Sequence, residues 1–151
     1  MKWAYHPYEV DASRICPSGI VFRPEARLRV GGQDGDAYLR ALIDTGADHT
    51  IFPMSVANNV GAEIFLDERD SAMGVGGHEI AIVPGLVQLE LHSEEGSYEW
   101  TAVVGFAEFD TMQEECSILG HAGCLEFFYA AFDGVAQIVE LRPRADLPLP
   151  V

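Results

Sequence analysis

The residues best suited to chemistry are Asp44-Thr45-Gly46, which directly follow an apolar run. A carboxylate at the end of an apolar strand needs hydrogen-bond partners, because burying an unpaired charge is costly. The Thr-Gly pair predicts a tight turn whose backbone N–H groups supply those partners, which makes the carboxylate a candidate acid–base group. The alternative is an Asx-turn that only closes a strand, since a three-residue pattern is common by chance. The sequence around the triplet has to distinguish the two.

Further features extend this motif in a fixed order along the chain. Apolar residues precede the triplet, and Ala47 and the polar segment 48–50 follow it. The glycine-rich stretch 73–77 suits a mobile hairpin tip, although an ordinary flexible loop explains it equally well. Residues 117–120 contain an apolar pair that ends in glycine and faintly repeats the pattern ending at Gly46. The elements together are more specific than any one alone.

The elements that must position these motifs are mainly β-strands. Apolar runs are short and are separated by glycine, proline and polar residues, which favours a mostly β protein. Residues 86–91 alternate apolar and polar side chains, as a half-buried strand does. Asp133-Gly134 predicts a tight hairpin turn, while Pro53 and Gly61 predict the start and end of a short helix. The expected strands are 20–30, 37–43, 80–83, 86–91, 98–106, 127–132 and 135–141.

Composition limits the class of protein and its partners. The chain has 151 residues, 48% of them hydrophobic, which suits one domain with a substantial core. A formal charge of −15 and the absence of any Lys/Arg cluster disfavour nucleic acid and anionic membrane surfaces as partners. No apolar run is long enough for a membrane span, and the first residues lack the apolar core of a secretory signal. A cytoplasmic location is therefore expected.

The cysteines indicate free thiols and no metal site. Cys16, Cys116 and Cys124 are an odd and sparse set, which predicts a reducing compartment and not a disulfide framework. Cys116, His121 and Cys124 lack a Cys-x2-Cys pair and a fourth ligand nearby. The sequence has no phosphate-binding loop, dinucleotide fingerprint or serine-nucleophile motif. No metal and no cofactor are expected.

The motifs in this order resemble those of the retropepsin-like aspartic proteases. In that family an apolar-apolar-Asp-Thr-Gly-Ala element precedes a glycine-rich flap and then an apolar-apolar-Gly element. The resemblance implies a mostly β, single-domain retropepsin-like fold of closed, barrel-like sheets with one or two short helices. It assigns this domain to residues 20–141, between an N-terminal segment, 1–19, that is a candidate interface and a C-terminal tail or interface strand, 142–151.

The resemblance also assigns roles by position. The catalytic residues would be Asp44, Thr45 and Gly46, with Asp44 as the catalytic carboxylate. The substrate-binding residues would be Ala47, Asp48, His49, Val75, Gly76 and Gly77. Structural support would come from Leu119, Gly120 and His121. Retroviral enzymes usually place an arginine at the position of His121, which suggests a contact between Asp48 and His121 that strengthens on acidification.

One Asp-Thr-Gly motif per chain implies a homodimer. Peptide hydrolysis of this type needs two carboxylates in one site, one of which stays protonated. The expected function is therefore a dimeric aspartic endopeptidase acting on peptides or proteins, with Asp44 of each protomer at a two-fold axis and segments 3–10 and 142–151 as candidate interface strands. The alternative is a catalytically silent retropepsin-like module for dimerisation or peptide binding. Because the charge doubles to −30, salt or lower pH should favour association.

Overall fold

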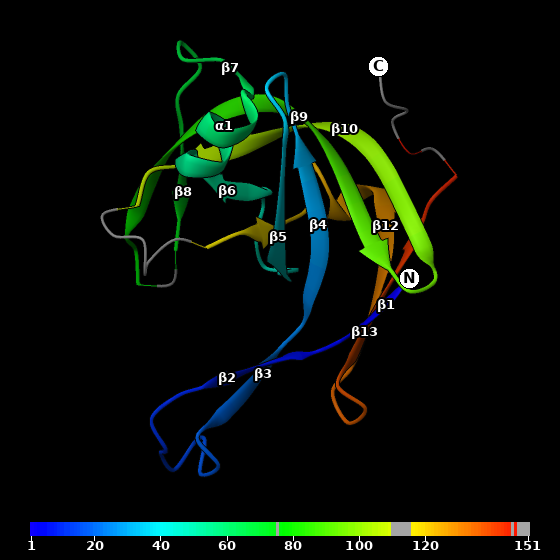
Figure 1. The fold of residues 1–151 in the computed structure, drawn as a ribbon. Helices are drawn as coiled ribbons and strands as arrows, with labels where there is room; N and C mark the ends of the chain where they lie inside the picture. The colour runs from blue at the N-terminus through cyan, green and yellow to red at the C-terminus, as the bar shows by residue number, and fades with distance from the viewer. Residues whose placement is uncertain (75, 110–115, 146, 148–151) are drawn as a thin grey trace.

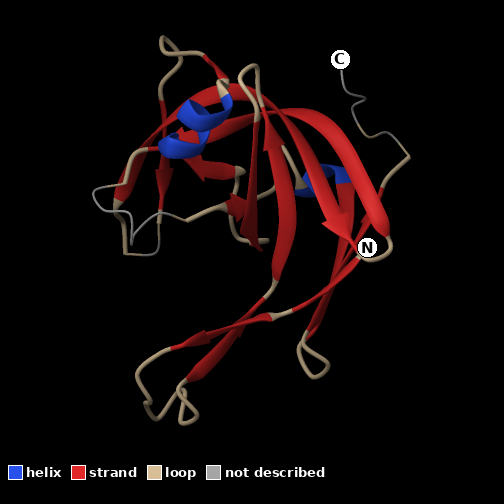
Figure 2. Cartoon of the chain, in the orientation of Figure 1, coloured by secondary structure: helices blue, strands red, loops and turns tan. Residues whose placement is uncertain are grey.

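β-strands make up most of the computed structural model, which describes residues 1–74, 76–109, 116–145 and 147 (Figures 1 and 2). The helices are α1 (Met54–Val60) and the short 3₁₀ helix η1 (Leu125–Phe127). The predicted mostly β class with one or two short helices is confirmed. None of the helices described is long and apolar enough to cross a membrane. The strands are β1 (Lys2–Ala4), β2 (His6–Glu9), β3 (Ile20–Arg23), β4 (Glu25–Gly31), β5 (Asp36–Ile43), β6 (Ile51–Pro53), β7 (Glu63–Ile64), β8 (Asp70–Met73), β9 (Glu79–Ser93), β10 (Gly96–Ala107), β11 (Ile118–Leu119), β12 (Phe128–Asp133) and β13 (Ile138–Pro143).

The largest sheet has the strand order β10-β6-β11-β5-β4-β9-β7, with β8 also paired to β9. β10 also pairs with β9. The hydrogen-bonded strands from β10 through β6, β11, β5, β4 and β9 therefore form a path that returns to β10. Two of the pairings are parallel, β11 with β5 and β10 with β6, and they connect segments far apart in the chain. A three-stranded sheet, β1-β13-β12, and the two-stranded sheet β2-β3 complete the fold. Within one chain, β1 pairs with residues 138–140 of β13, which precede the predicted interface segment 142–151, whereas residues 142 and 143 pair with β12.

The predicted first hairpin and the predicted helix are both present. The hairpin at residues 20–43 is formed by β4 and β5, and its first predicted strand is divided at Pro24, which has no N–H to donate. The helix α1 follows Pro53 directly. Gly61 ends it with a φ of 65°, a left-handed conformation that glycine adopts without steric cost.

The prediction that Pro84-Gly85 separates two strands is wrong, because β9 continues through both residues. Pro84 lies opposite Gly105 of β10. The Gly105 N–H donates to the Thr50 carbonyl at 2.9 Å, on the side away from Pro84. At such a position β10 takes no hydrogen bond from residue 84, so the missing N–H of proline does not interrupt the pairing.

The turn between β12 and β13 is longer than predicted. Four residues, 134–137, connect the strands in place of a two-residue Asp-Gly turn, and β13 begins at Ile138. The Asp133 carboxylate accepts the N–H groups of Val135 and Ala136 at 3.0 and 2.8 Å. Gln137 takes the positive φ, at 53°. The side chain of Asp133 thus forms an Asx-type turn that replaces the expected backbone turn.

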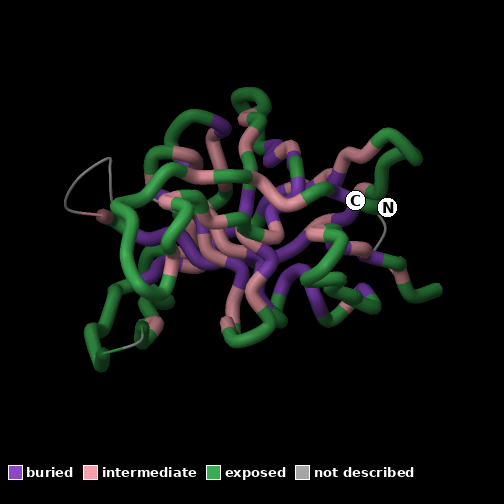
Figure 3. The backbone as a smooth tube through the Cα atoms, turned by 90° about the horizontal axis from the view of Figure 1, so that it is seen from below, coloured by how far each residue is buried: buried purple, intermediate pink, exposed green. Residues whose placement is uncertain are grey.

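One face of the strands in the large sheet supplies most of the core, and residues of α1 and of the three-stranded sheet complete it. Val87, Leu89 and Leu91 are buried, whereas Gln88 and Glu90 on the other face of β9 are partly exposed, so the predicted alternation is confirmed. Figure 3 shows the buried residues gathered in the middle of the molecule and the exposed ones along its outer loops. The largest fully buried side chains include Trp100, Phe52, Phe106, Leu28, Leu89, Leu91, Leu119 and Leu141.

Arg29 binds a group of carboxylates on the outer face of the large sheet. Its guanidinium donates to Glu90 and Asp36, each at 2.8 Å, and to Glu99. Glu90 and Glu99 lie opposite each other on β9 and β10, so the two carboxylates would repel each other if Arg29 did not bind both. Burial raises the pKa of Glu90, but hydrogen bonds from Arg29 and Ser97 and nearby positive charge outweigh it, so this pKa lies below its usual value.

Arg29→Gln is expected to lower the free energy of unfolding by about 1–2 kcal/mol at pH 7, since it leaves half-buried carboxylates without their partner. A carboxyl group whose pKa is lowered by folding stabilises the fold above its unfolded pKa and loses that contribution as the pH falls through the folded pKa. The difference between wild type and variant should therefore shrink below about pH 4, as measured by urea unfolding at pH 7 and pH 3.

Arg27→Gln is the matched control for this prediction. Arg27 lies on the same face of β4 but opposite Arg40, and no ion pair of Arg27 occurs in the described part of the chain. Its removal should leave the stability unchanged or slightly raised. A loss in Arg29→Gln that is the same at both pH values would contradict the electrostatic explanation.

Candidate active site

Asp44 directly follows β5 and helps to form its own turn. The Gly46 N–H donates to Asp44 Oδ1 at 2.9 Å, and the Ala47 N–H donates to the Asp44 carbonyl at 3.2 Å. The Asp44 N–H donates to the Leu119 carbonyl at 3.1 Å, which ties the turn to β11. Asp44 is half-buried, while Thr45 is exposed. The turn therefore holds a carboxylate by one oxygen at a position that solvent reaches.

β11 positions this turn from behind. It lies between β5 and β6, the strands on either side of the turn. Ile118 pairs with Leu42 in parallel and with Ile51 antiparallel. The apolar-apolar-Gly motif therefore lies directly beside Asp-Thr-Gly, although more than 70 residues separate them in the chain.

Gly120 occupies a place in which no side chain fits. A Cβ atom there would lie 2.3 Å from the His49 carbonyl oxygen and 2.8 Å from the Ala47 carbonyl oxygen. Its N–H donates to Thr50 Oγ1 at 3.2 Å, and both Thr50 and Leu119 are fully buried. The backbone at Gly120 thus packs directly against the segment that follows the Asp44 turn.

His121 contacts Thr45 and not Asp48. Its Nε2 lies 2.8 Å from the Thr45 carbonyl oxygen and donates to it in the tautomer that carries the proton on Nε2. Both His121 and Asp48 lie in the described part of the chain, and no side-chain hydrogen bond or ion pair joins them, so the predicted contact is wrong. Backbone bonds connect the segments instead, from the His121 N–H to Ala47 at 2.9 Å and from the Ala122 N–H to Asp48 at 2.8 Å. This pairing brings the imidazole to the Thr45 carbonyl.

The glycine-rich stretch connects β8 to β9 as a hairpin. The Gly74 N–H donates to the His78 carbonyl at 3.0 Å, and the Gly77 N–H donates to the Gly74 carbonyl at 3.1 Å. Gly76 and Gly77 have φ values of 100° and 78°, which favour glycine. A hairpin tip is thus present where the sequence predicts one. Val75, the remaining residue assigned to it, lies outside the described residues.

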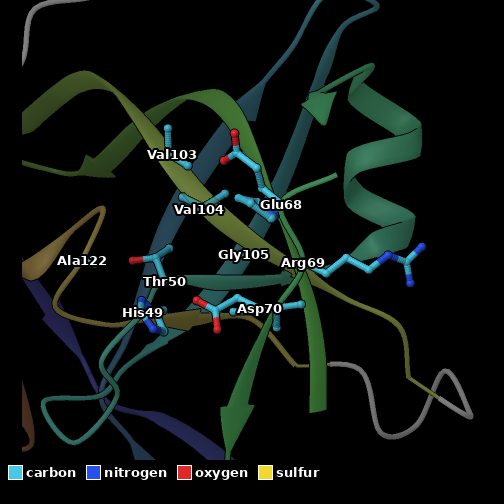
Figure 4. A pocket seen from close by; sticks show the side chains of 11 residues that line it. His49, Thr50, Glu68, Arg69, Asp70, Val103, Val104, Gly105 and Ala122 are labelled. Carbon is cyan, nitrogen blue, oxygen red and sulfur yellow. The ribbon is translucent and has the colours of Figure 1, made fainter. Parts of the chain in front are cut away.

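A cavity of about 310 Å³ adjoins the segment after the turn (Figure 4). It is lined by His49 and Thr50, by Val103 to Gly105 of β10 and by Glu68 to Asp70 at the start of β8, and Figure 4 shows Arg69 extending away from it. Asp44 is not part of the lining. Among these residues only His49 is predicted from the sequence, because the others come together through strand pairing that no local pattern marks.

The thiols near the motif are poor nucleophiles. Burial raises the pKa of Cys124, and the charge of Glu126 raises it further. Burial also raises the pKa of Cys116, so both thiols are protonated at neutral pH. Across residues 1–74, 76–109 and 116–145, no three His, Cys, Asp or Glu side chains are grouped so that they could hold a metal ion.

Comparison with known proteins gives a family match that contains the turn. The model of the family described as retroviral aspartyl protease matches residues 22–59. Among solved structures, the EIAV protease complexed with the inhibitor HBY-793 is 18% identical, with 66% of this chain and 82% of that chain covered and a TM-score of 0.43. No curated protein matches. The matched residues carry Asp-Thr-Gly and include both strands that β11 joins, so this part of the chain is similar to the retroviral aspartyl proteases.

Proposed function

We propose that this chain is an aspartic endopeptidase that acts as a homodimer, with Asp44 from each protomer in one site. The observation that carries the proposal is the Asp44 turn. One carboxylate oxygen accepts the Gly46 N–H at 2.9 Å, and β11 and Gly120 support the turn from behind. This arrangement fixes the direction of a solvent-accessible carboxylate, as acid–base catalysis requires.

The mechanism follows from placing two such carboxylates side by side. Two close carboxylates do not both ionise easily, so the pair shares one proton and titrates as a unit. The ionised member takes a proton from a water molecule, and the protonated member donates to the carbonyl oxygen of the scissile bond. The oxygen of that water then bonds to the carbonyl carbon. Breaking of the C–N bond, with protonation of the leaving amine, completes the hydrolysis.

The surrounding residues take the roles that the resemblance implies. We assign Thr45 to bracing the turn against the partner's turn, and Ala47, Asp48 and His49 to the walls of the substrate cleft. The hairpin tip with Gly76 and Gly77 would cover the bound peptide, and the cavity beside His49 would receive one of its side chains. The pairing of β10 with both β6 and β9 supports the closed, barrel-like sheet expected of this class.

The test is cleavage of a denatured protein mixture between pH 4 and pH 7 at a series of enzyme concentrations. Because each site needs two chains, the rate per chain should rise with concentration until the dimer is saturated. Added Asp44→Asn chain should then inhibit, since a mixed dimer has one carboxylate. Random pairing in a C2 dimer predicts that a threefold excess lowers wild-type activity to about one quarter.

Two results would count against the proposal. Asp44-dependent cleavage that the Asn chain does not inhibit would indicate a complete site in one protomer. A stable dimer that cleaves nothing at any pH would favour the catalytically silent module for dimerisation or peptide binding.

A further inference from the structure

The hairpin of β2 and β3 extends away from the rest of the chain (Figure 1). We call residues 6–23 the arm. Its strands pair in register from His6 with Arg23 to Glu9 with Ile20, and no other described strand pairs with either of them. A two-stranded hairpin by itself is marginally stable in water. We therefore expect a further surface to complete the arm.

The side chains on one face of the arm contact other residues of the same chain. The Tyr8 hydroxyl donates to the buried Glu25 carboxylate at 2.7 Å. The Arg23 guanidinium lies 4.9 Å from the centre of the Tyr8 ring, and His6 packs edge-on against the same ring at 5.1 Å. Burial raises the pKa of Tyr8, and the hydrogen bond to Glu25 adds to the rise. This face needs no partner.

The opposite face is apolar and uncovered. Strand alternation places Pro7, Ile20 and Phe22 on it, with Glu9 as the charged member. We call Pro7, Ile20 and Phe22 the apolar arm face. Ile20 is 42% exposed and Phe22 is 43% exposed, and the neighbouring Val10 is 40% exposed. Adjacent exposed apolar side chains of this size are typical of an interaction surface.

The arm leaves the large sheet beside the Asp44 turn. β3 leads through Pro24 into β4, and the Pro24 carbonyl accepts the Ile43 N–H at 2.9 Å. Asp44 is the next residue, and Figure 1 shows β2 and β3 projecting beyond this end of β5. A strand of four residues extends about 13 Å. The arm can therefore reach a molecule that stands opposite Asp44.

We propose that the apolar arm face packs against a second copy of this chain, so that each protomer of the dimer is held by the arm of the other. The inference rests on the proposed function, because one Asp44 per chain places a second copy opposite the turn. In a C2 dimer the same contact is made twice, once by each arm. The contact would add apolar area to an interface that the Asp44 turns alone are too small to stabilise.

The test measures the dimer dissociation constant by sedimentation equilibrium at pH 5. It compares wild type with a variant of the arm and with a control variant at an exposed strand position outside the arm. The double variant Ile20→Thr/Phe22→Thr removes the two large side chains of the apolar arm face. It leaves the charge unchanged and places a β-branched residue at both strand positions. Its dimer dissociation constant should rise at least about tenfold, since two large side chains no longer leave water on association. Tyr38→Thr is the control, because Tyr38 is 72% exposed on β5 outside the arm. Its constant should stay within about twofold of wild type.

Hydrogen exchange supplies an independent readout on the wild-type chain. The backbone amides of residues 20–23 should gain protection as the protein concentration passes through the dimer range. Matching circular dichroism spectra for the three proteins would show that the variants fold.

The outcomes separate the arm from the catalytic proposal. Dimerisation of the double variant as in wild type, or a wild-type chain that stays monomeric, would overturn the role of the arm. Normal dimerisation with a raised KM for peptide would assign the apolar arm face to substrate instead. If the double variant is monomeric while wild type forms a dimer that cleaves nothing, the role of the arm in dimerisation is supported and the proposed proteolytic function is contradicted.

Discussion

Asp44→Asn should lower kcat by at least about 10³-fold, because general acid–base catalysis typically contributes about 10²–10⁴-fold and an amide neither takes up nor releases a proton here. The fold should persist. The side-chain oxygen of the introduced asparagine can still accept the Gly46 N–H that Asp44 Oδ1 accepts at 2.9 Å. Thermal unfolding should therefore change by no more than about 2 °C, while progress curves on a peptide or denatured-protein substrate show no turnover above background.

Asp133→Asn is the matched control for this variant. Asp133 also caps its own turn, accepting the N–H groups of Val135 and Ala136 at 3.0 and 2.8 Å, but it is the last residue of β12, in another part of the fold. If the Asp44 carboxylate only closed a strand, both substitutions would affect activity equally little. Full activity in Asp133→Asn with none in Asp44→Asn separates chemistry from turn formation. Residual cleavage by Asp44→Asn near the wild-type rate would assign catalysis to another group.

Gly120→Ala should destabilise the fold by at least about 3 kcal/mol, at the upper end of overpacking costs. The added Cβ would lie 2.3 Å from the His49 carbonyl oxygen and 2.8 Å from that of Ala47. Both are backbone atoms of the segment that hydrogen-bonds to residues 121 and 122, so no side-chain rotation relieves the overlap. For a chain of this size the melting temperature should fall by about 10 °C. Relief of the clash would displace the Asp44 turn, so the cleavage rate should fall by more than the loss of folded protein explains.

The control is a glycine with open space around it. Gly134, in the turn after β12, has no atom other than those of its chain neighbours within 4 Å of the position that an added Cβ would take. Gly134→Ala should therefore leave the melting temperature within about 2 °C of wild type. Calorimetry of the three proteins decides the matter, and equal melting temperatures would show that the backbone behind the Asp44 turn yields more easily than its packing implies.

Local chemistry in the sequence was sufficient for the parts of the fold that short segments determine. The Asp-Thr-Gly turn forms through a bond between residues two apart, from the Gly46 N–H to Asp44 Oδ1. The helix α1 lies between Pro53 and Gly61 because their backbone preferences begin and end it. Alternation along β9 predicted which of its side chains are buried. Each depends on intrinsic conformational preference or on hydrophobic periodicity, which are written in neighbouring residues.

Tertiary structure decided what depends on residues far apart in the chain. The ring of His121 binds the Thr45 carbonyl instead of Asp48, since backbone pairing with Ala47 sets its direction. Pro84 continues a strand because β10 takes no hydrogen bond from residue 84. The Asp133 side chain forms a longer turn than the Asp-Gly pair predicted. The parallel pairing of β11 with β5, which supports the Asp44 turn, has no local signature. Such pairings are selected by the summed packing and hydrogen bonding of the whole sheet, so their partners are fixed only when the chain has folded.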